Sequence, residues 1–263
     1  GKNYEVAATV VAMHTQGILI GDASGVMLAF LGEAPAVAVN DAVTVKGTTE
    51  LRNGVIQFGK EGLSVAKTGT GSYNTPAPEV MDGTAVTAYI ATALENKAVY
   101  KYVKYNGEFT VSGNNYNVVI AGTTTKGSVA YGKSEWASFN GKPVTVEGWL
   151  LGGTANYLQT MATSVTVDSS TPIVKISAPQ QFAATSPVAQ TLNYTVTNTT
   201  ASAVTFAIEG TNADKFSLGA KTDNTIVVSA KGDNASTAAY TANLVAKVAG
   251  ATVATVATVK MIP

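Results

Sequence analysis

The sequence predicts an all-β protein built from two related barrels followed by a β-sandwich. Its 263 residues suffice for two or three small domains. Only 13% of them are charged, and the abundant Thr, Val, Ala and Gly favour pleated strands over long helices. A degenerate internal repeat relates the two barrels, and a different strand spacing marks the sandwich.

The first barrel is expected over residues 1–67. Alternation of apolar and polar residues indicates five short strands, and Asn53-Gly54 is a strong hairpin signal before the last of them. The expected strands are 4–13, 18–20, 26–31, 42–51 and a segment that follows Asn53-Gly54. Five strands with a connection between the third and the fourth are the plan of an OB-like barrel.

The repeat places a second OB-like barrel over residues 83–168, after a Gly/Ser/Pro linker at 68–82. The matched residues are Val43, Val45 and Gly47 with Val144, Val146 and Gly148; Ile56-Gln57 with Leu158-Gln159; and Leu63 and Val65 with Val165 and Val167. The offset grows by one residue after the first group. Because strand register cannot absorb an insertion, we expect one inserted residue in the intervening turn.

Within the second barrel, hairpin signals occur at Asn106-Gly107 and Gly113-Asn114. Gly152-Gly153 stands where the first barrel has Asn53-Gly54. The insert at 122–140 is longer than its counterpart and is expected to hold a short helix at 134–139.

A second linker is expected at 169–172, followed by an immunoglobulin-like sandwich over 173–263. Alternating apolar residues recur in this part at intervals typical of a sandwich. Examples are Leu192, Tyr194 and Val196, and later Val204, Phe206 and Ile208.

Three segments carry a resemblance to known families. Residues 17–26 and 40–47 resemble OB-fold modules of Bacteroidetes-type surface proteins, and Phe206–Leu218 is similar to a signature of immunoglobulin-like repeats in bacterial surface proteins. The layout is also similar to the BACON family, although the Ser-Trp pair of that family is missing here. The resemblance implies a secreted or outer-cell-surface protein, a lipid anchor in a preceding segment, and polysaccharide or another surface protein as partner.

Composition argues against several classes of function. Seventeen basic residues balance seventeen acidic ones, and Arg52 is the only arginine, so the sequence does not indicate nucleic-acid binding. The absence of cysteine excludes thiolate chemistry and disulfides. No apolar run is long enough to form a transmembrane helix.

No catalytic, metal or cofactor site is predicted, and we expect the protein not to be an enzyme. His14 is the only histidine, and at the end of the first strand it is interpreted as a barrel-rim residue. Asp22, in Asp22-Ala23-Ser24-Gly25, is expected to cap its own turn rather than to bind calcium. The acidic residues are scattered, and no pair suggests glycoside hydrolysis.

Aromatic residues are concentrated in the second barrel, where residues 89–157 hold seven of the eleven tyrosines and both tryptophans. Exposed rings can stack on sugars or nucleobases. Tyr100 and Tyr102 are expected on one face of a strand, and Tyr131 and Trp136, in the long insert, are expected to be the most exposed. These four are the candidate ligand-binding residues. The alternative is that the rings fill the barrel and cover its ends.

Three functions follow as hypotheses. The first is a non-catalytic binding or accessory module, with carbohydrate as the ligand class. The second is a structural spacer or adhesin stalk, which predicts low exposure of Tyr100, Tyr102 and Trp136. The third is single-stranded nucleic-acid binding through the OB-like barrels, for which the near-zero net charge provides little attraction.

Overall fold

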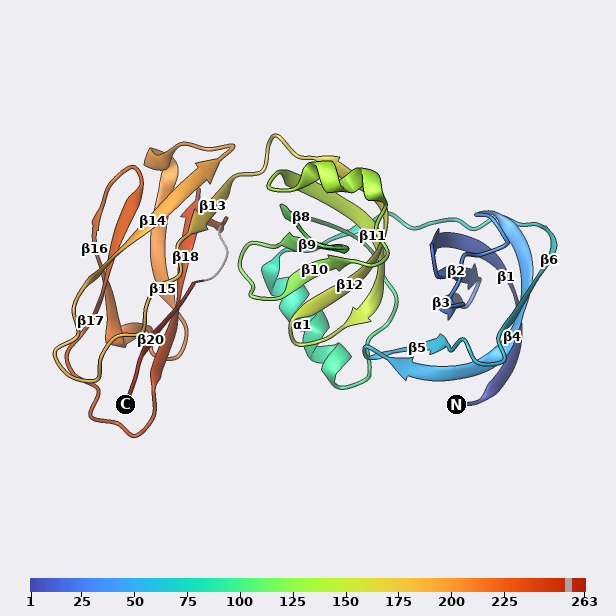
Figure 1. The fold of residues 1–263 in the computed structure, drawn as a ribbon, viewed down its shortest axis with the longest axis horizontal. Helices are drawn as coiled ribbons and strands as arrows, with labels where there is room; N and C mark the ends of the chain where they lie inside the picture. Colours follow the sequence, from blue (N-terminus) through green and yellow to red (C-terminus); the bar gives the residue numbers. More distant parts are fainter. Residues whose placement is uncertain (254–256) are drawn as a thin grey trace. The chain divides into compact units, whose positions relative to one another are not determined.

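The structure is a computed structural model that describes residues 1–253 and 257–263 (Figure 1). It is an all-β fold of two OB-like barrels and an immunoglobulin-like sandwich, as predicted. The chain divides into two compact units. One comprises Gly1–Val119 and Thr125–Val167, which contain both barrels, and the other comprises Ile120–Thr124 and Asp168–Pro263.

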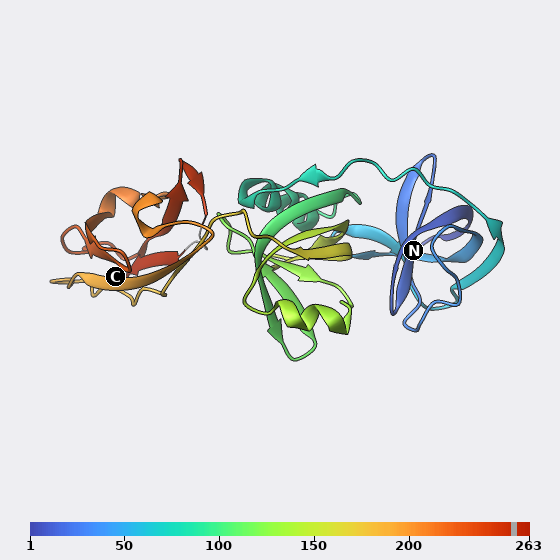
Figure 2. The same ribbon diagram turned by 90° about the horizontal axis from the view of Figure 1, so that it is seen from above.

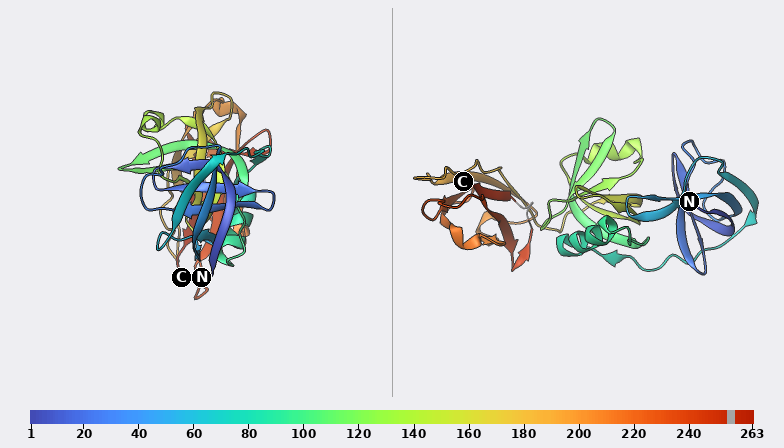
Figure 3. Two further views of the ribbon diagram at one scale, coloured as in Figure 1. Left: turned by 90° about the vertical axis from the view of Figure 1, so that its right-hand side faces the viewer. Right: turned by 90° about the horizontal axis from the view of Figure 1, so that it is seen from below.

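The first barrel is a six-stranded sheet in the order β1-β2-β3-β5-β4-β6, closed by pairing of β1 with β4. Its strands are β1 (Asn3–His14), β2 (Gly17–Asp22), β3 (Gly25–Phe30), β4 (Asp41–Arg52), β5 (Val55–Phe58) and β6 (Ser64–Thr70). The bounds of β1 to β4 agree with the predicted ones to within two residues, and β6 is a sixth strand where five were predicted. The left panel of Figure 3 faces this barrel and shows its strands crossing as they wrap around. Aliphatic side chains and Phe58 fill the core.

The second barrel repeats this topology, with β8, β9, β10, β12 and β11 in order and β11 closing on β8. Its elements are β7 (Glu79–Val80), α1 (Gly83–Leu94), β8 (Tyr102–Ser112), β9 (Asn115–Val119), β10 (Lys126–Val129), the 3₁₀ helix η1 (Ser134–Phe139), β11 (Pro143–Gly153) and β12 (Tyr157–Val167). The short helix predicted at 134–139 is therefore confirmed. Figure 2 shows α1 and η1 on opposite sides of this barrel.

The strand register supports the repeat and corrects two parts of it. Leu51 pairs opposite Ile56 and Gly153 pairs opposite Leu158, so the two turns have equal length between these pairs. The extra residue of the second barrel forms a β-bulge between Leu150 and Gly153 of β11, and its predicted place in the turn is wrong because a bulge absorbs it within the strand. Further along, Val65 pairs opposite Val45 and Val165 pairs opposite Val146. The counterpart of Val65 is therefore Val165, and the prediction that it was Val167 is wrong.

Two turn predictions in the second barrel have different outcomes. Gly113-Asn114 forms the β8–β9 turn, as predicted. Asn106-Gly107 lies in the middle of β8 and is not a turn. A Cβ atom at Gly107 would lie 2.3 Å from the carbonyl oxygen of Val119, so glycine is needed here for close strand approach.

The predicted linker at 68–82 is strand at residues 68–70 and 79–80, while residues 71–78 have no regular secondary structure. Thr68–Thr70 belong to β6 and Glu79–Val80 form β7. The Asp82 side chain accepts a hydrogen bond from the backbone N–H of Ala85 at 2.8 Å and caps α1. This helix was not predicted, although the spacing of its buried residues Val86, Tyr89, Ile90 and Ala93 is helical.

The sandwich consists of a β13-β14-β17-β16 sheet and a second sheet in which β18 pairs with β15, β19 and β20. The elements are β13 (Ile173–Ile176), β14 (Gln190–Thr197), η2 (Ala201–Ala203), β15 (Val204–Glu209), η3 (Ala213–Lys215), β16 (Phe216–Lys221), β17 (Thr225–Ala230), β18 (Tyr240–Val248), β19 (Ala251–Thr252) and β20 (Ala257–Met261). The two sheets appear as separate layers in the right panel of Figure 3. Their facing side chains form one core that includes Phe182, Tyr194 and Phe216.

The predicted linker at 169–172 is tied to the sandwich. The Asp168 carboxylate accepts hydrogen bonds from the backbone N–H and hydroxyl groups of Ser170 and Thr171. Burial alone would raise the pKa of Asp168, but these hydrogen bonds outweigh it and hold the pKa at about 2. The Asn198 amide donates to the carbonyls of Asp168 and Thr171.

Candidate functional site

The β4–β5 hairpin of the first barrel ends against the second barrel. The carbonyl of Asn53 accepts a hydrogen bond from Gly153 N–H at 2.7 Å, and the carbonyl of Gly54 accepts one from Ala98 N–H at 3.1 Å. Gly54 has a φ of +81°, and a Cβ atom there would lie 2.2 Å from the carbonyl oxygen of Ala93. Glycine is therefore required at this contact.

An apolar cluster extends the contact between the barrels. Ala12, Leu19 and Leu28 of the first barrel are buried in one cluster with Trp149, Leu151 and Met161 of the second. Leu19 and Leu28 lie on β2 and β3, and in OB folds the face of the second and third strands is the usual ligand-binding face. The second barrel therefore covers part of that face.

Two of the predicted ligand-binding residues pack at this interface. Tyr100 is half-buried against the cluster, and its hydroxyl donates to the carbonyl of Ile56 at 2.7 Å. Tyr102 is also half-buried, with its ring 5.1 Å from that of Trp149 and its hydroxyl donating to Glu147 at 2.6 Å. Burial raises the pKa of both tyrosines. The two rings therefore do not form an open platform.

Trp136 was expected to be exposed, and this prediction is wrong because only 6% of its surface is accessible. The insert folds back as η1 instead of standing away from the barrel. Phe139, also on η1, packs edge-on against Phe109 with ring centroids 6.2 Å apart. The Lys133 ammonium lies 5.5 Å from the Trp136 ring. The tryptophan thus belongs to the packing at this end of the barrel.

Tyr131 is the predicted candidate that remains exposed, with 44% of its surface accessible. It follows β10 with a φ of +49°, a conformation that costs a non-glycine residue on the order of 1 kcal/mol. Its ring lies 4.4 Å from the imidazole of His14 on the first barrel. Such strain is retained where the surrounding structure or a function requires it.

His14 lies at the end of β1, as predicted, but it is buried, with 8% of its surface accessible. Its Nδ1 accepts a hydrogen bond from the backbone N–H of Gln16 at 3.0 Å. Burial lowers the pKa of His14 to about 4, so the ring is neutral at pH 7 and its proton is on Nε2. Within the described residues, this Nε2 has no hydrogen-bond partner, which costs about 1–3 kcal/mol.

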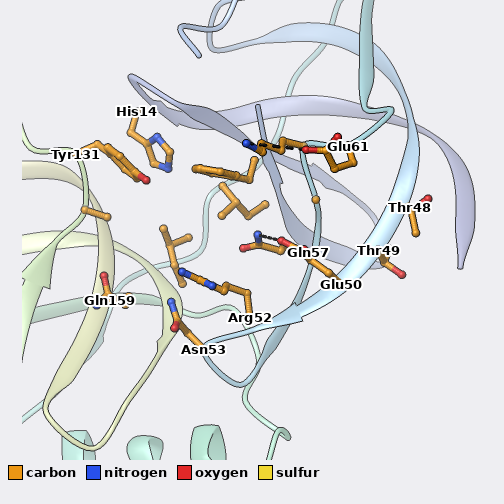
Figure 4. Close-up of a pocket in the computed structure, with 16 residues that line it drawn as sticks. His14, Thr48, Thr49, Glu50, Arg52, Asn53, Gln57, Glu61, Tyr131 and Gln159 are labelled. Carbon is orange, nitrogen blue, oxygen red and sulfur yellow. Dashed lines mark hydrogen bonds and ion pairs between the residues drawn. The ribbon is translucent and has the colours of Figure 1, made fainter. Parts of the chain in front are cut away.

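These residues line a cavity of about 570 Å³ between the barrels, which we call the inter-barrel pocket. Its volume is in the range of small-molecule sites. Figure 4 shows His14 and Tyr131 together on one wall. Glu50, Arg52 and Gln57 come from the β4–β5 hairpin, and Gln159 comes from β12.

The charged residues of the pocket differ in their partners. The Gln57 amide, which is buried, donates to Glu50 at 2.7 Å. Lys60 and Glu61 form an exposed ion pair at 3.9 Å. Within the described part of the chain, the Arg52 side chain has no hydrogen bond or ion pair.

The sequence did not predict that these residues line one pocket. His14 and Arg52 were each singled out as the only residue of its type, but they were not connected. Gln57 and Gln159 were noted solely as matching positions of the repeat. The available signal was the OB-like plan itself, since its usual ligand face and the turn after the fourth strand both border the pocket.

Three further predictions concern the turn at Asp22, metal binding and transmembrane helices. The Asp22 carboxylate accepts a hydrogen bond from Ser24 N–H at 2.7 Å, so it caps its turn as predicted. Among the described residues, no group of three His, Asp or Glu side chains is arranged to hold a metal ion. No helix in residues 1–253 and 257–263 has the length and apolar character needed to cross a membrane.

Comparison of the chain with protein-family models, with curated proteins and with solved structures returns no match. The resemblance to Bacteroidetes-type surface proteins and to the BACON family therefore stays a prediction.

Proposed function

We propose that the protein is a non-catalytic binding module for carbohydrate and that the ligand occupies the inter-barrel pocket. The observation that carries the proposal is Tyr131, an exposed aromatic ring held in a left-handed backbone conformation at the edge of a polar cavity. Sugars present apolar C–H faces and many hydroxyl groups, so an aromatic ring beside amide and hydroxyl side chains suits them.

The polar lining supports the same ligand class. Asn53, Gln57 and Gln159 supply amides, and Thr48 and Thr49 supply hydroxyls. A short saccharide would satisfy several of these groups at once.

Two features favour binding over catalysis. The Nδ1 lone pair of His14 is engaged by Gln16 N–H, so this imidazole is not placed to act as a general base. Glu50 is held by Gln57, and Glu61 lies beside Lys60. Glycoside cleavage requires an acid and a second carboxylate flanking the bond, and these two glutamates have other partners.

The test is binding of the full chain to a broad oligosaccharide panel, followed by calorimetric titration of the best ligand. Tyr131→Asn removes the ring but keeps a residue that tolerates the left-handed conformation, and we expect about tenfold weaker binding because a stacking ring contributes about 1–3 kcal/mol. Tyr131→Phe should retain most of the affinity.

The matched control is Tyr157→Asn, which removes a ring of similar exposure (39%) outside the pocket. It should leave the dissociation constant unchanged. Failure of the whole panel to bind, or equal losses in the two Asn variants, would contradict the proposed site.

A second function, a structural spacer or stalk, is favoured by the withdrawal of Trp136, Tyr100 and Tyr102 from solvent. Under this function the rings serve packing alone. It predicts no saccharide binding and wild-type behaviour of Tyr131→Asn in every binding assay. Location at the outer cell surface, with polysaccharide or another surface protein as partner, is part of both proposals and rests on the resemblance.

A further inference from the structure

We infer that the inter-barrel pocket selects an acidic saccharide, one that carries a carboxylate or sulfate group, and that Arg52 binds this group. The inference rests on the proposed carbohydrate-binding function and adds the charge of the ligand and the residue that recognises it.

The two glutamates of the pocket have partners, whereas Arg52 does not. Glu50 accepts from Gln57 at 2.7 Å, and Glu61 pairs with Lys60 at 3.9 Å. Arg52 has neither a hydrogen bond nor an ion pair within the described residues. A ligand with an anionic acceptor would supply the partner that Arg52 lacks.

Arg52 is well placed to present its guanidinium. It is the last residue of β4, and the next residue, Asn53, is held by the hydrogen bond from Gly153 N–H of the second barrel. The backbone that carries Arg52 is therefore fixed by both barrels. In Figure 4 its side chain reaches toward the side of the pocket on which Gln159 lies.

The chemistry of the guanidinium group points to a planar or branched anion. Its fork of N–H donors matches two oxygens of a carboxylate or sulfate at once, which a lysine ammonium does not do. Arg52 is the only arginine in the chain, so this geometry is available at one place.

The experiment compares matched ligands by calorimetric titration of the full chain. The probes are galacturonate, glucuronate and mannuronate oligosaccharides, their methyl esters, and sulfated galactan oligosaccharides. We expect at least one acidic oligosaccharide to bind about tenfold or more tightly than its uncharged counterpart, because a charge-assisted hydrogen bond is stronger than one between neutral groups.

Variants assign the effect to Arg52. Arg52→Gln should weaken binding of the acidic ligand to the level of the methyl ester and leave the ester unaffected, and Arg52→Lys should give an intermediate value. The control Lys97→Gln makes the same change of charge at an exposed ion pair outside the pocket, and it should change neither affinity.

The outcomes separate the two proposals. A methyl ester that binds as tightly as its acid overturns the inference about charge while the carbohydrate-binding function stands. Absence of binding to every saccharide overturns both. Binding of sulfated but not carboxylated ligands that depends on Arg52 supports the inference and assigns the anion as sulfate.

Discussion

The two barrels have the same strand order and closure but are filled differently. Val6 pairs opposite Val45 in the first barrel, whereas Tyr105 pairs opposite Val146 at the corresponding place in the second. The first core is aliphatic apart from Phe58, and the second contains fully buried Tyr105 and Phe109. The concentration of aromatic residues in the second barrel is thus mainly a property of its packing.

This difference changes where a ligand site is to be sought. Trp136 is buried at the end of the second barrel and Trp149 is buried at the interface, so both rings are engaged in packing. Most polar residues of the inter-barrel pocket come from the aliphatic first barrel. Gln159 and Tyr131 come from the second barrel, and the Tyr131 ring remains exposed at the pocket.

The largest expected effect tests the aromatic core. Tyr105→Ala should destabilise the second barrel by about 4 kcal/mol, because it removes a fully buried ring and the hydrogen bond to Thr160 Oγ1. Val6→Ala, at the corresponding half-buried position, should cost about 1 kcal/mol. Urea unfolding of the full chain, followed by the fluorescence of the two tryptophans of the second barrel, measures both. Equal costs would refute the contrast between the cores.

The next effect concerns His14 and pH. Its pKa is about 4 in the folded protein and about 6.5 when unfolded, so between these values the unfolded chain binds the extra proton. Stability should therefore fall by roughly 2 kcal/mol as the pH is lowered from 7 to 4.5. His14→Gln should lose this part of the pH dependence.

Nuclear magnetic resonance gives a direct check, because the chain has a single histidine and one imidazole signal. The midpoint of its titration should lie near pH 4. A midpoint near 6.5 would mean that the imidazole is not buried between the barrels.

The smallest effect tests the docking of the hairpin. Gly54→Ala combines a positive φ with a Cβ atom only 2.2 Å from the carbonyl oxygen of Ala93, whereas Gly113→Ala has a positive φ and open space. Gly113→Ala should cost about 1 kcal/mol, and Gly54→Ala about 1 kcal/mol more because the hairpin must move. Thermal unfolding compares the variants, and equal shifts would show that the hairpin tip is not in contact.

Local pattern was sufficient for much of the fold. Alternation and turn residues located five of the six strands of the first barrel, and the shift in the repeat indicated one inserted residue, which the structure holds as a bulge in β11. These features depend on neighbours in sequence, as strand faces and turns do. The helix α1 was missed because no element was assigned to residues 83–94, despite the helical spacing of Val86, Tyr89, Ile90 and Ala93.

The sequence by itself determined that the protein is all-β, that its first two barrels are related, and that one histidine and one arginine stand alone in it. The tertiary structure alone decided that Trp136 is buried, that Tyr131 is exposed, and that His14 and Arg52 line one pocket. Whether a side chain is buried, and which residues come together in one pocket, depend on which surfaces meet when the chain packs. Residues separated by many positions are brought together only by those contacts, and no local pattern encodes them.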